Sequence, residues 1–330
     1  MRSTCLIAAV LAACAATAPA GAQTILKLAH TDQQQSSRHA GSLLFARKVE
    51  ELSQGRYQVR VYCCGQLGND PKLVEQAALG GIDFAVTSTG SYAPHVPTLN
   101  LTMAPFVFDS YEQGWKFYDG SKWLRAQFDK APAKGFRFLA AWESGFRQMT
   151  TKQPLATPED ARGRKMRGWA NEMVLWSLEA MGFGVQIIPV PEVYVALQQG
   201  AVSGQENPID VSYTQKFYEV APYVTLTNHI YSPTPIAVSE KTWQKLPEAD
   251  RKLIARAAAE VTPYMRKLIR DNEDKLLADM QARGATINRS PDIPAFRKAV
   301  EPVYTKAREK YGADAETVFA EMAAVRAGGQ

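Results

Sequence analysis

Hydrophobic and polar positions along the first ninety residues follow two periods in turn, which predicts alternating strands and helices. Phe45, Val49 and Leu52 recur at the spacing of one helical face, and Gly55 lies just beyond them. We expect strands at Thr24–Ala29, Tyr57–Tyr62 and Ile82–Thr87, and helices over Arg38–Ser53 and from Asp70, as N-cap, to Gly80. The last of these strands is apolar without alternation, which is typical of burial on both faces. This β-α-β-α-β order predicts a mostly parallel, covered sheet.

A second alternating series follows a helical stretch at Tyr111–Lys130. We expect strands at Phe136–Ala141, Lys165–Trp169, Val185–Pro189 and Ser203–Glu206, and helices over Asn171–Met181 and Pro191–Gln199. Beyond residue 240 the pattern is almost entirely helical, with a long charged helix around Ala249–Arg283. Two separated series predict two α/β lobes. Because no low-complexity linker is present, we expect crossing segments to join the lobes and the long helix to brace both.

The N-terminus has the order of a secretory signal peptide. Arg2 precedes an apolar stretch over residues 5–17, and Ala20-Gly21-Ala22 supplies small residues for cleavage. This stretch is shorter than the roughly 20 apolar residues that span a bilayer. We therefore expect residues 1–22 to be removed on export. Leu11-Ala12-Ala13-Cys14 also resembles a lipoprotein processing box, and a lipid on Cys14 is the alternative.

Composition indicates a globular protein of two domains, with 330 residues of which 46% are hydrophobic and 22% charged. The net charge of +5 is small and the basic residues are scattered, which argues against nucleic acid as a partner. The histidines and cysteines have no metal-ligand spacing, and the common enzyme motifs are absent. We expect no catalytic activity, cofactor or metal. Cys63 and Cys64 are adjacent, either as a strained vicinal disulfide or, as we favour, as two small residues in a turn.

Arg167 is the most informative charged residue, because it lies inside a predicted covered strand, where arginine is rarely buried without a partner. In a strand, Lys165, Arg167 and Trp169 share one face and Met166 lies on the other. Two interpretations are open. Arg167 either forms a salt bridge with an internal carboxylate or holds a carboxylate ligand with its two parallel N–H donors. Trp169 either stacks on that ligand or fills the core.

Two further polar residues are candidates for the same chemistry. Arg147 follows the strand Phe136–Ala141 in a strand-end loop, a common ligand position in open α/β sheets, or is an exposed surface arginine. Asn207 precedes a proline, which favours an extended turn. Its amide suits a ligand with both carboxylate and hydroxyl groups, or bonds its own backbone. Glu206 is a candidate counter-ion for one of the arginines.

An ordered set of motifs runs along nearly the whole chain after residue 22. Arg164-Lys165-Met166-Arg167 is followed by Gly204-Gln205-Glu206-Asn207-Pro208. Other members of the set are Gly65–Gly68, Ala104–Phe108, Tyr194–Gly200, Lys216–Val220 and His229–Pro233. The set resembles the solute-binding proteins of tripartite ATP-independent periplasmic (TRAP) transporters, the DctP-type family.

The resemblance implies an α/β periplasmic binding protein fold: two lobes around a ligand cleft, crossing strands at the hinge and a long helix bracing both lobes. We place lobe I at 23–144 plus 233–272 and lobe II at 145–232 plus 273–330. The resemblance also implies that Arg167 pairs with a ligand carboxylate, assisted by Arg147 and Asn207. We expect Trp169, Ser88 and Asp210 to join them. Such a protein is not an enzyme; it is expected to act as a periplasmic monomer that delivers its solute to the TRAP membrane permease.

The sequence departs from the family pattern at two places that bear on the ligand. Gly168-Trp169 replaces the usual hydrophobic–proline pair, so we expect Trp169 to narrow the pocket. Ser88-Thr89-Gly90-Ser91 lacks the charged residues of sialic-acid-binding relatives. We therefore expect a small carboxylate with an apolar or aromatic portion, or a hydroxy or keto acid, and not sialic acid. A long polar sugar acid is the alternative ligand. A periplasmic enzyme acting on organic acids and a sensory receptor are the alternative functions.

Overall fold

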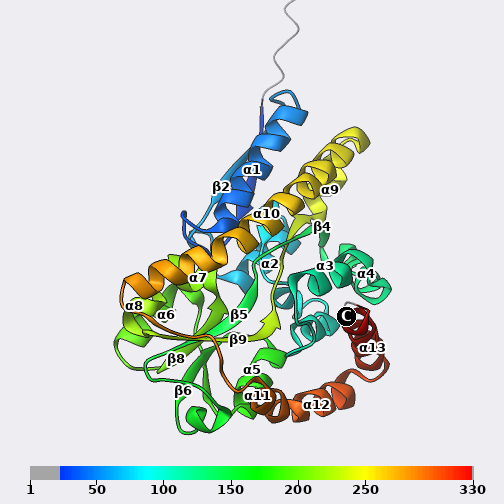
Figure 1. Cartoon of the computed structure of the whole chain (residues 1–330). Coiled ribbons are helices and arrows are strands. Elements are labelled where there is room, and N and C mark those ends of the chain that lie inside the picture. The colour runs from blue at the N-terminus through cyan, green and yellow to red at the C-terminus, as the bar shows by residue number, and fades with distance from the viewer. Residues whose placement is uncertain (1–22, 329–330) are drawn as a thin grey trace, which may run out of the picture.

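Two mixed β-sheets form the framework of residues 23–328, the part of the chain that this computed structural model describes (Figure 1). The first sheet has the order β2-β1-β3-β10-β4 and the second β11-β9-β5-β8-β6-β7. The strands of the first sheet are β1 (Thr24–Ala29), β2 (Tyr57–Tyr62), β3 (Phe84–Val86), β4 (Phe136–Trp142) and β10 (Thr234–Ser239). Those of the second are β5 (Phe146–Thr151), β6 (Lys165–Gly168), β7 (Gly184–Ile187), β8 (Gly204–Pro208), β9 (Tyr223–Tyr231) and β11 (Thr286–Asn288).

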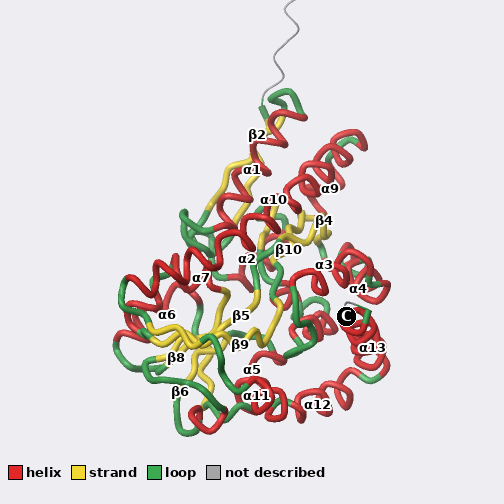
Figure 2. Tube along the Cα trace, viewed as in Figure 1, coloured by secondary structure: helices red, strands yellow, loops and turns green. Residues whose placement is uncertain are grey.

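Helices surround the two sheets (Figure 2). They are α1 (Ser37–Leu52), α2 (Asp70–Leu79), α3 (Tyr111–Gly120), α4 (Lys122–Phe128), α5 (Glu172–Ala180), α6 (Val190–Gln198), α7 (Ile209–Thr214), α8 (Phe217–Val220), α9 (Glu240–Lys245), α10 (Glu248–Ala282), α11 (Ile293–Ala299), α12 (Glu301–Tyr311) and α13 (Ala313–Ala327). No helix within residues 23–328 is both long and apolar enough to cross a membrane. The expected signal peptide and Cys14 lie outside the described residues.

The strands of the β-α-β-α-β opening pair in parallel as expected, but each sheet also contains an antiparallel strand. In the first sheet, β1 is parallel to β2 and β3, but β10 is antiparallel to β3 and to β4. In the second sheet, β5 is antiparallel to β8 and to β9. Each of these antiparallel strands, β5 and β10, is the strand that the chain enters after it leaves the other sheet, and the hydrophobic pattern predicted neither of them.

Two of the passages that the chain makes between the sheets run directly from strand to strand, at neighbouring places. It leaves β4 at Trp142 and enters β5 at Phe146, and it leaves β9 at Tyr231 and enters β10 at Thr234. Because β4 pairs with β10 and β5 with β9, the two passages lie side by side. These paired crossing strands support the lobe boundaries that we propose at 144/145 and 232/233.

The buried carboxylate of Glu143 holds the two passages together. It accepts hydrogen bonds from the backbone N–H groups of Ser144 (2.9 Å) and Gly145 (2.8 Å) on its own passage. It also accepts one from the hydroxyl of Tyr231 (2.7 Å), at the end of β9, and one from the indole of Trp115 (2.6 Å). Burial raises the pKa of Glu143, although these four donors lower it. The crossing point is therefore a hydrogen-bonded unit.

The long helix α10 packs against the cores of both sheets and crosses the molecule diagonally (Figure 1). Ile254 and Val261, in its first half, belong to the apolar core formed with the first sheet. Leu277 and Met280, near its end, belong to a separate core that includes Val224 of β9. The expectation that this helix braces both lobes is confirmed by these contacts.

Several element boundaries differ from those expected. The helical stretch at 111–130 is two helices, because Ser121 ends α3 and its side chain caps α4. The N-cap of α2 is Asn69, whose side chain accepts a hydrogen bond from the N–H of Lys72, and Asp70 is the first helical residue. The strand β11 interrupts the helical C-terminal region.

Truncating Leu277 tests the contact of α10 with the second sheet. Leu277 is 1% exposed, whereas its neighbour Leu276 is half-buried. We expect Leu277→Ala to lower the free energy of unfolding by about 2–5 kcal/mol, because it removes a buried side chain and leaves a cavity. Leu276→Ala is the matched control and should cost clearly less. Equal losses in urea denaturation would mean that the end of α10 is not packed as described.

Candidate functional site

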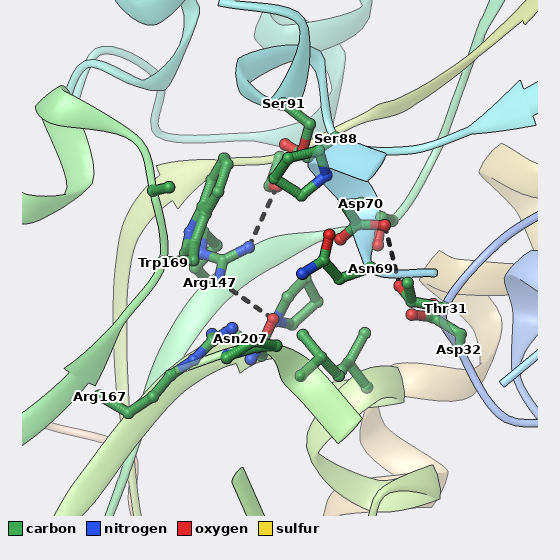
Figure 3. A pocket seen from close by; sticks show the side chains of 18 of the residues that line it. Thr31, Asp32, Asn69, Asp70, Ser88, Ser91, Arg147, Arg167, Trp169 and Asn207 are labelled. Atoms are coloured by element: carbon green, nitrogen blue, oxygen red, sulfur yellow. Dashed lines mark hydrogen bonds between the residues drawn. The ribbon is translucent and has the colours of Figure 1, made fainter. Parts of the chain in front are cut away.

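A cavity opens between the two sheets, and residues from both contribute to its lining (Figure 3). Residues that follow β1 and β3 or begin α2 form one side, and residues in or just after β5, β6 and β8 form the other. Polar residues on the first side include Thr31, Asp32, Arg38, Asn69, Asp70, Ser88 and Ser91. Those on the second side include Arg147, Arg167, Trp169 and Asn207. Apolar residues 187–190 add a hydrophobic wall. Five of the six expected site residues thus line one cavity, and Asp210 does not.

Arg147 lies inside β5 and not in a strand-end loop, which corrects the expected position. Its guanidinium is paired with the carboxylate of Glu206 on the neighbouring strand β8, and Nη2 lies 2.8 Å from Oε1. Nη2 also donates to the backbone oxygen of Glu206 (2.7 Å) and to Oδ1 of Asn207 (3.0 Å). Both side chains are nearly inaccessible to solvent. Arg147 therefore already has its counter-ion within the protein, and that counter-ion is Glu206.

Arg167 has no such partner among the described residues. Its side chain is 1% exposed, and Nε donates to the backbone oxygen of Ile188 (2.7 Å). Nη1 is buried and makes no hydrogen bond to the residues that the structure describes. No carboxylate within residues 23–328 lies close enough to form a salt bridge with it. Burial lowers the pKa of Arg167 to about 10, which still leaves the group charged at neutral pH. The structural salt bridge considered from the sequence is therefore not formed.

Asn207 lies in β8, where it orients Arg147. Its Oδ1 accepts from Arg147, and its Nδ2 donates to Oε1 of Gln205 (2.6 Å). The amide thus connects the arginine to the strand and does not bond its own backbone. One N–H of Nδ2 is left for a ligand.

Trp169 brings a second unpaired donor to the cavity. Its ring lies 5.7 Å from the guanidinium carbon of Arg147, within the range of a cation–π contact. Its Nε1 is buried and has no hydrogen-bond partner among the described residues. On the other side the ring packs against Gly90, where a Cβ would lie 2.9 Å from the indole. A glycine at position 90 therefore lets Trp169 of one sheet reach the loop that follows β3 of the other.

Asp210 lies outside the lining of the cavity, in α7, and its contacts link α7 to α1. Its carboxylate accepts hydrogen bonds from the N–H (3.1 Å) and the hydroxyl (2.7 Å) of Ser37, at the first turn of α1. An acceptor at that position satisfies a helical N–H group that has no partner within the helix. Ser88 lies in the lining, on the side of the first sheet.

Two acidic residues of the lining were not expected from the sequence. Asp32 follows β1 and is paired with Arg38 (Nε to Oδ2, 3.0 Å). Asp70 begins α2, lies 3.8 Å from the same arginine, and accepts a hydrogen bond from the hydroxyl of Thr31 (2.9 Å). Burial raises the pKa of Asp32 to about 6, against the opposite effect of Arg38. The position of Asp32 at the end of a strand was the available signal.

Cys63 and Cys64 are free thiols in a turn after β2, as favoured from the sequence. The N–H of Cys64 donates to the backbone oxygen of Asp32 (3.0 Å), so this turn supports the loop that carries Asp32. Within residues 23–328 no three histidine, cysteine or acidic side chains are grouped as metal ligands would be.

The Arg147–Glu206 pair predicts how stability changes in acid. Burial disfavours the ionised form of Glu206, but Arg147 and His229 outweigh it and lower its pKa to about 2. A carboxylate with a lowered folded-state pKa stabilises the fold above its unfolded pKa. That contribution is lost as pH falls from about 4.5 to about 2, at roughly 1.4 kcal/mol per pH unit.

We therefore expect the stability difference between wild type and Glu206→Gln to shrink over this pH range in urea denaturation. Glu179→Gln, at an exposed position of α5, is the matched control and should show no such change. A constant difference for Glu206→Gln would contradict the lowered pKa.

Comparison with known proteins identifies the family. Residues 28–310 match the family described as bacterial extracellular solute-binding protein, family 7 (DctP). A solute-binding protein of Verminephrobacter eiseniae is 33% identical over 89% of this chain and 88% of its own length. The C4-dicarboxylate-binding periplasmic protein DctP of Rhodobacter capsulatus is 31% identical over 97% and 96%. A TRAP periplasmic solute-binding protein of Polaromonas sp. JS666, with bound D-erythronate, superimposes with a TM-score of 0.87 at 35% identity, over 91% and 99%. The chain belongs to family 7 of the bacterial extracellular solute-binding proteins, the TRAP solute-binding proteins that its motifs resemble.

Proposed function

We propose that this protein is the periplasmic component of a TRAP transporter that binds a small organic acid through its carboxylate and delivers it to the membrane permease. The observation that carries the proposal is the buried, charged and unpaired guanidinium of Arg167 in the wall of the cavity. A buried charge is strongly unfavourable without a partner. A ligand carboxylate supplies that partner with two parallel acceptors.

The neighbouring ion pair supports this assignment of the ligand to Arg167. Glu206 neutralises Arg147, so Arg147 adds hydrogen-bond donors and shape but no net charge. Arg167 then provides one positive charge, which matches one carboxylate. The names of two relatives agree with this chemistry, because the Rhodobacter protein is named for C4-dicarboxylates and the Polaromonas structure contains D-erythronate.

Residues from both sheets surround the cavity, which suggests how binding is coupled to closure. A carboxylate that docks on Arg167 extends toward Ser88 and Asp70 on the side of the first sheet. Contacts to both sides exist only in the closed form, so the ligand shifts the population toward closure. The paired crossing strands at Glu143 and the helix α10 join the sheets and provide a hinge for that motion.

We propose further that the protein acts without catalysis and as a monomer in the periplasm. The family consists of solute-binding proteins, and the polar residues of the cavity are engaged in binding roles that need no proton transfer. The expected signal peptide, residues 1–22, would direct the export of the chain.

Replacing Arg167 tests the proposal. We expect Arg167→Ala to raise the Kd for a carboxylate ligand at least about 100-fold, because leaving one partner of a buried pair without the other costs about 3–5 kcal/mol. Arg167→Lys should recover only part of the affinity, since an ammonium lacks the planar pair of donors. Calorimetry with a panel of organic acids measures the effect.

Lys165→Ala is the matched control, because Lys165 lies on the same strand, carries the same charge and is exposed. It should bind like wild type. Unchanged affinity in Arg167→Ala, with a fold intact by circular dichroism, would contradict the anchor role.

A further inference from the structure

The cavity has opposite polarity at its two ends, and this restricts the ligand further. Arg147, Arg167 and Trp169 lie on one side, and Asn69, Asp70 and Asp32 on the other (Figure 3). The first side has two buried N–H donors without partners among the described residues, Nη1 of Arg167 and Nε1 of Trp169. The second side has carboxylate acceptors.

Formal charges give the same polarity. On the arginine side, Glu206 cancels Arg147, which leaves the single positive charge of Arg167. On the acidic side, Asp32 and Asp70 carry two negative charges and Arg38 carries one positive charge, so that side has an excess of one negative charge. Other groups nearby do not reverse this excess. The pKa values of His30 and His39 are lowered, chiefly by burial, so both are neutral at pH 7.

Arg38 also lines the cavity, and it is paired with carboxylates of the protein itself. Its Nε is held by Asp32 at 3.0 Å, and its Nη1 faces Asp70 at 3.8 Å. Nη1 also lies 3.5 Å from the hydroxyl of Thr31 and from the backbone oxygen of Val86. Two of the three nitrogens of this guanidinium are thus directed at groups of the protein, and its charge is set against two carboxylates.

We propose that the site takes a hydroxylated monocarboxylic acid, and that Asp32 and Asp70 make it reject a second carboxylate. The inference rests on the proposed function, because it assumes that one carboxylate is bound by Arg167. Hydroxyl groups at the far end donate to the aspartates, which can only accept when ionised. The apolar wall at 187–190 contacts the carbon chain between the two ends.

The two ends of the cavity thus have separate tasks. Arg167 and Trp169 bind the carboxylate of the ligand. Asp32 and Asp70 discriminate between the groups that its other end can carry. A dicarboxylate places like charges together in a buried site, which is unfavourable. When an acid without hydroxyl groups binds, Asp32 and Asp70 lose the hydrogen bonds that they made to water and gain none in return.

The test is calorimetry at pH 7.5 with four-carbon acids that differ in their hydroxyl groups and in the group at the far end. The probes are erythronate, succinate, butyrate and 4-aminobutyrate, with gluconate, adipate and hexanoate as a six-carbon series. We expect the hydroxylated acid of at least one series to bind about 10- to 100-fold more tightly than the dicarboxylate and the plain acid of that series. The inference is overturned if succinate or adipate binds as tightly as the tightest hydroxylated acid, and also if 4-aminobutyrate or a plain acid does.

Variants separate this inference from the proposed function. In Asp70→Asn and Asp32→Asn the ratio of the Kd for the dicarboxylate to the Kd for the hydroxylated acid should fall at least about 10-fold, because one repelling charge is gone. Glu75→Gln, an exposed carboxylate of α2, is the control and should leave the ratio unchanged. An unchanged ratio in both aspartate variants would overturn the role of these residues.

The two failures are distinguishable. If no acid of either series binds to the wild-type protein, the proposed function itself is contradicted. If acids bind and lose affinity in Arg167→Ala, but without preference for hydroxyl groups, only the inference of this subsection fails. The wild-type comparison stays informative even where an aspartate variant folds poorly.

Discussion

The binding site depends on a buried guanidinium that the protein does not neutralise. Arg167 is held in β6 by a hydrogen bond to a backbone oxygen, with no carboxylate in salt-bridge range within residues 23–328. Two strands away in the same sheet, Arg147 is neutralised by Glu206 of the strand between them, β8. The same kind of side chain thus has two roles in one sheet. Arg147 is part of the folded framework, and Arg167 is left with a charge that a ligand can satisfy.

The fold makes this unpaired charge useful because it places Arg167 opposite residues of the other sheet. Two crossing passages, joined at Glu143, and the helix α10 connect the sheets. The cavity between them takes its donors from one sheet and its acidic groups from the other. Trp169, which packs on Gly90, and Asp210, which accepts from Ser37, add contacts between the same two sides. In the mechanism that we propose, binding and closure are therefore linked through groups on the sides of different sheets.

Much of the fold could be predicted from local patterns. The strands β1 and β2 have the bounds expected from alternation, and α5, α6 and α10 lie within one residue of theirs. The strand β5 was missed because four of its six residues, FRQMTT, are polar and yet all six are buried. The side chains of Arg147 and Gln148 bond residues of β8 and β9, which are distant in sequence. A pattern that assigns polar residues to the surface cannot detect such a strand, and Arg147 was placed in a loop for that reason.

Some residues of the candidate site were predicted and others were missed, for a related reason. Arg167 stood out because a charge in a covered strand is unusual on its own. Asp70 did not, since an aspartate before a proline is fully explained as a helix start. The acidic side of the cavity exists only once β1, α2 and the second sheet are brought together. Asp210 was expected in the cavity, but its position in the first turn of α7 directs it to the first turn of α1.

The most direct measurement of the central claim is a crystal structure of the protein with a bound hydroxylated acid such as erythronate. The account predicts a carboxylate oxygen of the ligand within hydrogen-bond distance of Nη1 of Arg167, with the Arg147–Glu206 pair intact. A ligand carboxylate bound instead to Arg38, or to Arg147 after displacement of Glu206, would contradict it.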